Sequence, residues 1–237
     1  MRGFSMEGTI RTMSEQLVNI ALCMTLCFAT WGIFYNVLHR KLGINYTEHF
    51  WWTTFYFLSA GALVVLIFWR QASKMLQAEA PVPLIVLSVF MAALLAWSLY
   101  FPRRVREPID YFETYPDRYY LKISWRRVVA KSADIAAQQF FITLLVLFLR
   151  DAGLPLYQIL LWFLFLFSLL HIPLILSEWG RWPAALFAGA VVLFSFTFPF
   201  LILYVPYGFV YTFIVHWLFY TLTASVFWSI KSIDVKI

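Results

Sequence analysis

Charged residues are scarce in this sequence. Only 13% of the residues are Asp, Glu, Lys or Arg, about half the share expected in a soluble domain. In their place, 62% of the residues are hydrophobic and the mean hydropathy is +0.77. This deficit excludes a water-soluble fold. We therefore attribute the net charge of +6 to loops that face anionic lipid, and we expect no nucleic-acid partner.

Cysteine is nearly absent as well. Cys23 and Cys27 lie four residues apart in the first apolar run, on one face of the expected helix. That spacing within a continuous helix is unsuited to a disulfide, and two thiols alone make a poor metal site. We interpret both residues as packing residues and expect neither a metal nor a cofactor.

Long apolar runs are abundant, and seven of them approach the 20 or so residues that cross a bilayer core. The fourth is the weakest because it carries several polar residues. The sequence predicts an all-α fold, a polytopic membrane helical bundle in a lipid bilayer, divided into three helices plus a basic and aromatic loop (residues 1–127) and a four-helix core (128–237). The predicted spans are Leu17–Val37, Phe50–Trp69, Val82–Tyr100, Val128–Leu149, Leu156–Leu176, Pro183–Leu203 and Val205–Trp228.

The distribution of Lys and Arg predicts the orientation. With seven spans, the side that holds the 101–127 loop and the C-terminus receives 13 of the 18 basic residues, and the other side receives 5. Cytoplasmic loops carry the excess of Lys and Arg, so we expect the C-terminus in the cytoplasm and the N-terminus outside. The glycosylation sequon at Asn45 then falls on the cytoplasmic side. Basic and aromatic residues alternate in the loop, which indicates a segment in the headgroup layer or, alternatively, a docking surface for a partner.

Polar residues inside the expected spans are the most informative ones, because a polar group in hydrocarbon costs free energy unless it is paired. Lys131, Asp134 and Gln138 follow i, i+3, i+7 spacing and share one helix face, and Gln139 lies about 100° further round. His171 interrupts the fifth run in the same way.

His216 interrupts the seventh run. Together with Gln138 and His171, it places polar groups of three helices in the cytoplasmic half of the bundle, with His216 the deepest, so we predict that the three side chains converge in a cavity. The alternative is that each one bonds a neighbouring helix. Neither histidine has a Cys or carboxylate beside it in sequence, which argues against a metal site.

Three motifs in residues 130–227 resemble those of the CAAX-protease and bacteriocin-processing family of intramembrane glutamate proteases. The family's Glu-Glu-x-x-x-Arg corresponds to Gln138–Thr143, its Phe-x-x-x-His is present as Phe167–His171, and its His-x-x-x-Asn or Asp corresponds to His216–Tyr220. The resemblance implies a protease-like core in the last four helices and a bacterial inner membrane.

The departures from these motifs bear on activity. The resemblance implies a mechanism in which a glutamate activates a water molecule while histidines orient it. Gln138 and Gln139 cannot take up a proton in this way, Thr143 replaces the arginine, and Tyr220 replaces the final amide or acid. Asp134, one turn before Gln138, is the nearest carboxylate.

Three functions follow as hypotheses. The first is a catalytically silent relative of this family that binds a membrane-protein partner or substrate in the former active-site cavity. The second is an unconventional intramembrane peptidase that uses Asp134 with His171 and His216. The third is a structural or assembly subunit of a larger membrane complex.

Overall fold

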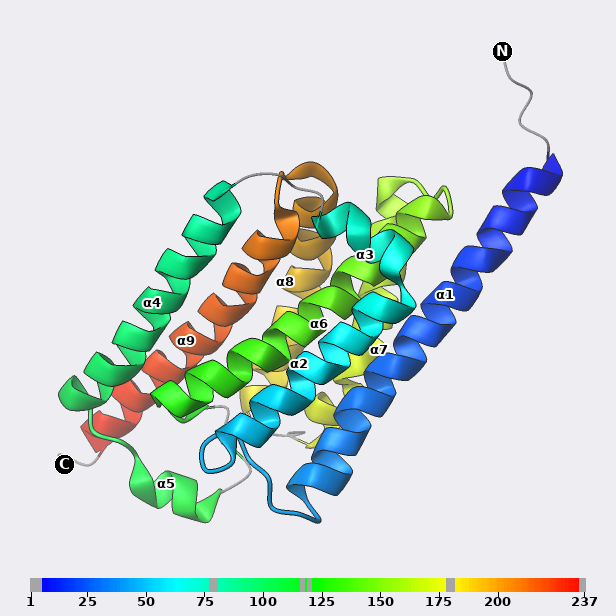
Figure 1. Cartoon of the computed structure of the whole chain (residues 1–237). Helices are drawn as coiled ribbons and strands as arrows, with labels where there is room; N and C mark the ends of the chain where they lie inside the picture. The colour runs from blue at the N-terminus through cyan, green and yellow to red at the C-terminus, as the bar shows by residue number, and fades with distance from the viewer. Residues whose placement is uncertain (1–5, 77–80, 116–117, 119–120, 178–181, 235–237) are drawn as a thin grey trace. The chain divides into compact units, whose positions relative to one another are not determined.

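The structure, a computed structural model, describes residues 6–76, 81–115, 118, 121–177 and 182–234. All regular secondary structure in these ranges is helical (Figure 1). The elements are α1 (Met6–Ile33), the π-helix η1 (Phe34–His39), α2 (Phe50–Ile67), α3 (Trp69–Leu76), α4 (Pro81–Arg104), α5 (Ile109–Thr114), α6 (Trp125–Asp151), α7 (Leu156–Ser177), α8 (Trp182–Tyr204) and α9 (Gly208–Asp234).

Seven helical segments within the described residues are long and apolar enough to cross a membrane, which confirms the predicted all-α polytopic fold. They are Met13–His39, Phe50–Ile67, Pro83–Arg104, Trp125–Asp151, Leu156–Leu176, Trp182–Tyr204 and Gly208–Lys231. The protein is therefore an integral, multi-pass membrane protein in a lipid bilayer.

The largest differences from the predicted boundaries are at the start of the first span, Met13 in place of Leu17, and at the end of the third, Arg104 in place of Tyr100. At the end of the second span the helix itself is interrupted. The apolar run was predicted to continue to Trp69, but α2 ends at Ile67 and the short helix α3 begins at Trp69. The residues that follow, Arg70 and Gln71, are polar, so the hydrocarbon-compatible stretch stops there. Helix α8 ends at Tyr204 and α9 begins at Gly208, so the predicted seventh span, which started at Val205, begins three residues too early and the turn contains Pro206.

Gly208 is required at this turn. A Cβ atom at this position would collide with the backbone carbonyl of Leu201, and the preceding Tyr207 has a φ of 62°. A residue other than glycine cannot fit without moving the backbone. The sequence therefore closes this hairpin with the one residue type that the close approach allows.

The described structure falls into two compact units, each assembled from segments that are far apart in the sequence. Unit 1 comprises residues 1–34, 63–77 and 138–209, and unit 2 comprises residues 35–62, 78–137 and 210–237. The predicted division of the chain at residue 127 stays a prediction.

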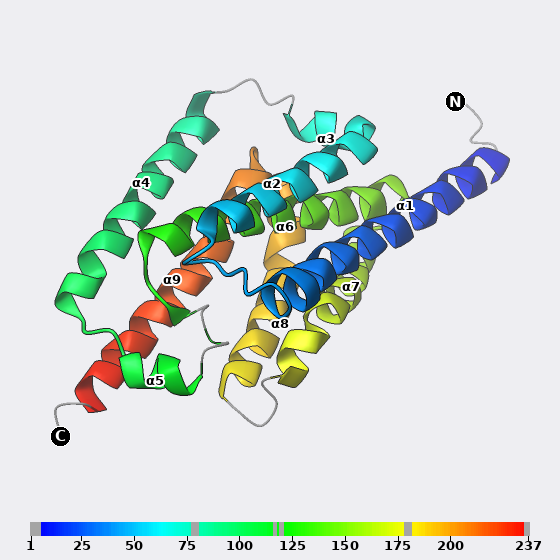
Figure 2. The ribbon, with the colours of Figure 1, turned by 60° about the horizontal axis from the view of Figure 1, so that its bottom comes forward.

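In unit 1, helices α7 and α8 pack side by side (Figures 1 and 2). The rings of Phe167 and Phe198 meet at this contact, with their centroids 6.1 Å apart. Helix α1 packs against the second half of α6: the Cys23 thiol points to the carbonyl oxygen of Phe141, and the Trp31 ring meets the Phe141 ring edge-on. Both cysteines are buried and no disulfide joins them.

In unit 2, α4 and α9 run side by side in the same direction (Figures 1 and 2). Trp97 donates to Ser225, and one turn further along both helices Phe101 meets Trp228. The first half of α6 runs antiparallel to α9, and the indole of Trp217 on α9 donates to Ser132. These helices share a buried apolar cluster, which comprises Leu94, Val128, Ile135, Phe213 and Trp217.

The connection between α4 and α6 is folded onto the C-terminal end of α9. Phe112 of α5, Leu121 and Ile123 are buried against Phe227 and Trp228, and the Trp228 indole donates to the carbonyl oxygen of Leu121 at 2.8 Å. We refer to this set as the loop cluster. The loop therefore lies at the same end of unit 2 as the end of α9; its location in the headgroup layer stays a prediction.

Candidate functional site

Helix α6 carries most of the polar residues singled out in the sequence, and it is the most buried of the seven spans. In its most apolar stretch, 78% of the residues are buried, against 11–33% in the other spans. A helix with little lipid contact tolerates polar side chains as long as they find partners. This explains why the weakest hydrophobic run is nevertheless a complete span of 27 residues.

Lys131 and Asp134 form a buried ion pair on the first half of α6. The Lys131 ammonium lies 2.6 Å from Oδ2 of Asp134, and the two side chains are 7% and 0% exposed. The same carboxylate oxygen accepts a hydrogen bond from the Tyr46 hydroxyl at 2.8 Å. Tyr46 comes from the connection between η1 and α2, so the pair ties that connection to α6.

Two aromatic rings flank the ammonium of Lys131. Its Nζ atom lies 4.4 Å from the centroid of the Tyr220 ring on α9 and 5.6 Å from that of Tyr46. Such cation–π contacts are strongest where water is excluded. We refer to Tyr46, Lys131, Asp134 and Tyr220 as the Lys131 cluster.

His216 extends this cluster along α9. It is buried and its ring stacks on that of Tyr220, with centroids 5.5 Å apart and an angle of 15° between the planes. His216 therefore reaches the Lys131 cluster through Tyr220, at the i, i+4 spacing of one helix face.

The glutamines and His171 belong to unit 1. Gln139 is fully buried and Gln138 half-buried on α6. One turn after Gln139, Thr143 is buried, and its hydroxyl has no hydrogen-bond partner among the described residues. On α7, His171 is half-buried; its Nδ1 lies 2.8 Å from the carbonyl oxygen of Phe167, and its ring contacts the Phe167 ring.

The predicted convergence of Gln138, His171 and His216 stays a prediction, because His216 lies in unit 2 and the other two residues lie in unit 1. What the structure does bring together is Asp134 with Lys131. The Asp134 carboxylate accepts hydrogen bonds from an ammonium and a phenol, and the charges of Lys131 and Asp134 stabilise each other in a low-dielectric interior. A carboxylate held in this way is not presented to a water molecule.

Tyr46 was not identified from the sequence, and Tyr220 was identified only as the residue that replaces the final amide or acid of the third motif. Tyr220 carried a usable signal, since it lies four residues after His216 on the expected helix. Tyr46 carried none, because 88 residues separate it from Asp134. Among the described residues, no group of three or more His, Cys, Asp or Glu side chains is placed to hold a metal ion.

Comparisons with known proteins add no relative. No family model matches the chain, and neither a curated protein nor a solved structure is similar to it.

Proposed function

We propose that this protein is a catalytically silent relative of the CAAX-protease and bacteriocin-processing family, which binds a membrane-protein partner through its polar interior. The observation that carries the proposal is the state of Asp134. Its carboxylate is fully buried and accepts from both Lys131 and Tyr46, so the nearest carboxylate to the degenerate motif is already committed. The motif positions themselves hold glutamines, which cannot act as a general base.

The binding part of the proposal rests on polar groups that no reaction accounts for. Thr143 presents a buried hydroxyl with no hydrogen-bond partner in the described part of the chain, one turn from the buried Gln139. A buried polar group without a partner costs about 1–3 kcal/mol. Because Thr143 lies inside the bundle, a partner or substrate would have to insert a polar group into the interior to recover this free energy, as hydrogen bonds between membrane helices do.

A peptidase assay tests the silent state. We expect the purified protein to leave membrane-peptide substrates intact, as do its Asp134→Asn and His171→Ala variants, because a missing base alone lowers a rate about 10²–10⁴-fold. Cleavage by the wild type that disappears in both variants, at a temperature where both variants are folded, would instead establish the unconventional peptidase. Purification in mild detergent tests the partner. If a membrane protein co-purifies and Thr143→Val weakens its binding, the proposal is supported. If Thr143→Val leaves the binding unchanged, a structural subunit is favoured.

We also propose that the N-terminus faces outward and the C-terminus lies in the cytoplasm, in a bacterial inner membrane. The 13-to-5 distribution of basic residues supports the orientation, and the family resemblance supports the membrane. In a background in which both native cysteines are replaced by alanine, an impermeant thiol reagent should label Leu154→Cys in intact cells. Tyr115→Cys and Ser232→Cys should react only after the cells are opened. Labelling of either of these two from outside contradicts the orientation.

A further inference from the structure

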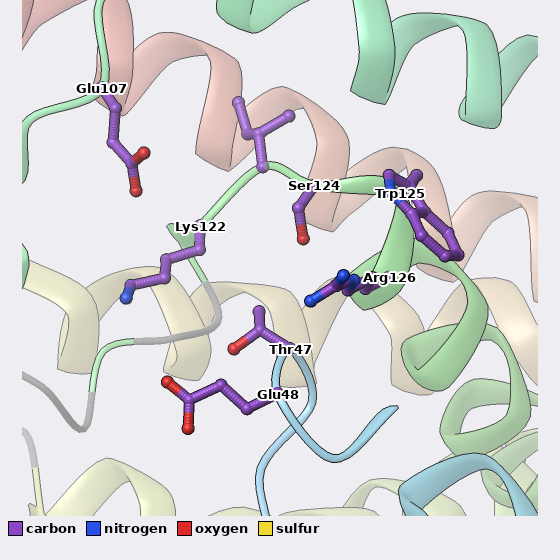
Figure 3. Close-up of a pocket in the computed structure, with 8 residues that line it drawn as sticks. Thr47, Glu48, Glu107, Lys122, Ser124, Trp125 and Arg126 are labelled. Carbon is purple, nitrogen blue, oxygen red and sulfur yellow. The ribbon is translucent and has the colours of Figure 1, made fainter. Parts of the chain in front are cut away.

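A cavity of about 350 Å³ opens in unit 2 beside the loop cluster, and it uses none of the residues discussed so far as site candidates. Figure 3 shows it surrounded by side chains of three segments: the connection between η1 and α2, the start of the loop after α4, and the approach to α6. The volume lies at the lower end of the range for small-ligand pockets. The lining residues are Thr47, Glu48, Glu107, Lys122, Ile123, Ser124, Trp125 and Arg126.

The charges in the lining are balanced but not paired with one another. Glu48 and Glu107 supply two carboxylates, and Lys122 and Arg126 supply two cations (Figure 3). Within the described part of the chain, none of the four takes part in an ion pair. The cations instead contact aromatic rings: the Lys122 ammonium lies over Phe112, and the Arg126 guanidinium lies over Trp125. Glu48, Glu107 and Arg126 are exposed and Lys122 is half-buried, so charges of both signs are open to a ligand that enters the cavity.

The wall that holds Glu48 is ordered by Asn45. The Asn45 side-chain oxygen accepts from the backbone N–H groups of Thr47 and Glu48, at 3.0 and 2.8 Å. Its amide nitrogen donates to the Glu48 carboxylate at 3.2 Å. The carboxylate is therefore positioned before any ligand arrives, which lowers the entropy cost of binding.

The opposite wall is ordered by Ser124 and Arg127. The Ser124 hydroxyl accepts from the backbone N–H of Arg127 and so caps the start of α6. The buried Arg127 guanidinium donates back to the carbonyl oxygen of Lys122. Residues 122–126 are thereby fixed at both ends, and so are the backbone positions of the two cations.

The location of the cavity points to lipid. All of its lining residues except Glu107 lie at the starts of two membrane spans, which begin at Phe50 and Trp125. Three tryptophans at these starts are exposed, Trp51 at 68%, Trp52 at 66% and Trp125 at 40%. Exposed tryptophans at the ends of spans mark the interface where lipid headgroups lie.

We propose that this cavity binds the headgroup of a zwitterionic phospholipid with a primary amine, of the phosphatidylethanolamine type. Lys122 and Arg126 bind the phosphate, and Glu48 and Glu107 bind the ammonium. Each contact is a charge-assisted hydrogen bond, the strong class in proteins. A quaternary ammonium cannot donate such bonds, so the site discriminates against phosphatidylcholine; a headgroup with negative charge only meets the two carboxylates and is disfavoured as well.

Lipid binding to the full chain in detergent micelles, followed by native mass spectrometry, tests the proposal. The probes are short-chain phosphatidylethanolamine, phosphatidylcholine and phosphatidylglycerol, with free phosphoethanolamine as competitor. We expect one phosphatidylethanolamine to be retained in preference to the other two lipids. Glu48→Gln with Glu107→Gln should remove this preference while phosphatidylglycerol still binds. Lys122→Gln with Arg126→Gln should weaken the binding of phosphatidylethanolamine and of phosphatidylglycerol on the order of tenfold or more.

Matched controls change the same charges outside the cavity. Arg103→Gln and Glu113→Gln alter exposed residues of the same region and should leave the preference intact. The protein's melting temperature with and without added lipid provides a second readout, which identifies any variant that has lost its fold. Wild-type protein with no preference among the three lipids overturns the proposal. So does an unchanged preference in both double variants, or binding of phosphoethanolamine without retention of the lipid. None of these outcomes depends on whether the protein cleaves peptides.

Discussion

Replacing Lys131 by methionine is expected to lower the free energy of unfolding by about 3–5 kcal/mol, because it leaves the Asp134 carboxylate buried without its counter-ion. The Lys131 side chain is 7% exposed and the Asp134 side chain 0% exposed, so water cannot take over the role of the lost partner. Asp134→Asn should cost a similar amount, since it strands the ammonium among the rings of Tyr46 and Tyr220. Reversible unfolding in mild detergent measures both effects.

The double variant Lys131→Met with Asp134→Asn separates the pair from its surroundings. It contains no buried charge at this site, and the asparagine oxygen still accepts from Tyr46. We expect it to be more stable than either single variant, which is the signature of strong coupling between two residues. If the losses of unfolding free energy in the two single variants simply add up in the double variant, Lys131 and Asp134 are not coupled and the ion pair does not stabilise their charges.

The chain offers a matched control in a second Lys–Asp pair. Lys74 and Asp151 lie 3.1 Å apart, but their side chains are 47% and 21% exposed. Exposed pairs contribute about 0–1 kcal/mol. Lys74→Met should therefore have a small effect, because water and the Arg150 guanidinium, 2.8 Å from Oδ1 of Asp151, still stabilise the carboxylate.

The number of spans could be predicted from the sequence because it depends on a local property. A bilayer core demands a run of about 20 mostly apolar residues, and each of the seven runs meets that demand on its own, the fourth in spite of its polar residues. The predicted common face of Lys131 and Asp134 on α6 follows from helical spacing and is likewise local. The structure accordingly places these two side chains in direct contact.

The partners of that face could not be predicted, because they depend on the path of the chain. Tyr46 and Tyr220 come from a connection and a helix that lie far from α6 in sequence. Periodicity also favoured Gln138 as the inward-facing glutamine, whereas Gln139 is the fully buried one. On a helix that is buried over most of its circumference, a period of 3.6 residues no longer separates an inner from an outer face.

The loop cluster gives the second large expected effect. Trp228 is fully buried, contacts Phe101 and Phe112, and donates to the carbonyl oxygen of Leu121 at 2.8 Å. Trp228→Ala should cost about 3–5 kcal/mol, the range for removing a buried aromatic side chain. Trp228→Phe keeps most of the ring but leaves the carbonyl oxygen without its donor, so it should cost about 1–3 kcal/mol.

Trp228→Ala should also release the loop between α4 and α6 from α9. Trp228 links α9 to the segment after α5, where Arg118 is buried and its guanidinium donates to the Tyr111 hydroxyl. Once the indole is gone, this segment opens more often and trypsin reaches it sooner, since proteolysis follows local opening. We expect faster cleavage after Arg118 and Lys122 in Trp228→Ala than in the wild type, at a temperature where both proteins are folded.

Trp51→Ala is the control for the loss of an indole. Trp51 is 68% exposed at the start of α2, so its removal leaves no cavity and should change neither the unfolding free energy nor the cleavage rate appreciably. If Trp228→Ala unfolds like the wild type and resists trypsin equally, the loop is held by contacts other than this cluster. If it is destabilised without faster cleavage, Trp228 stabilises α9 and its neighbours while the loop stays closed by itself. Only the combination of a large loss of stability with early cleavage at Arg118 and Lys122 fits a loop that is fastened to α9 through one indole.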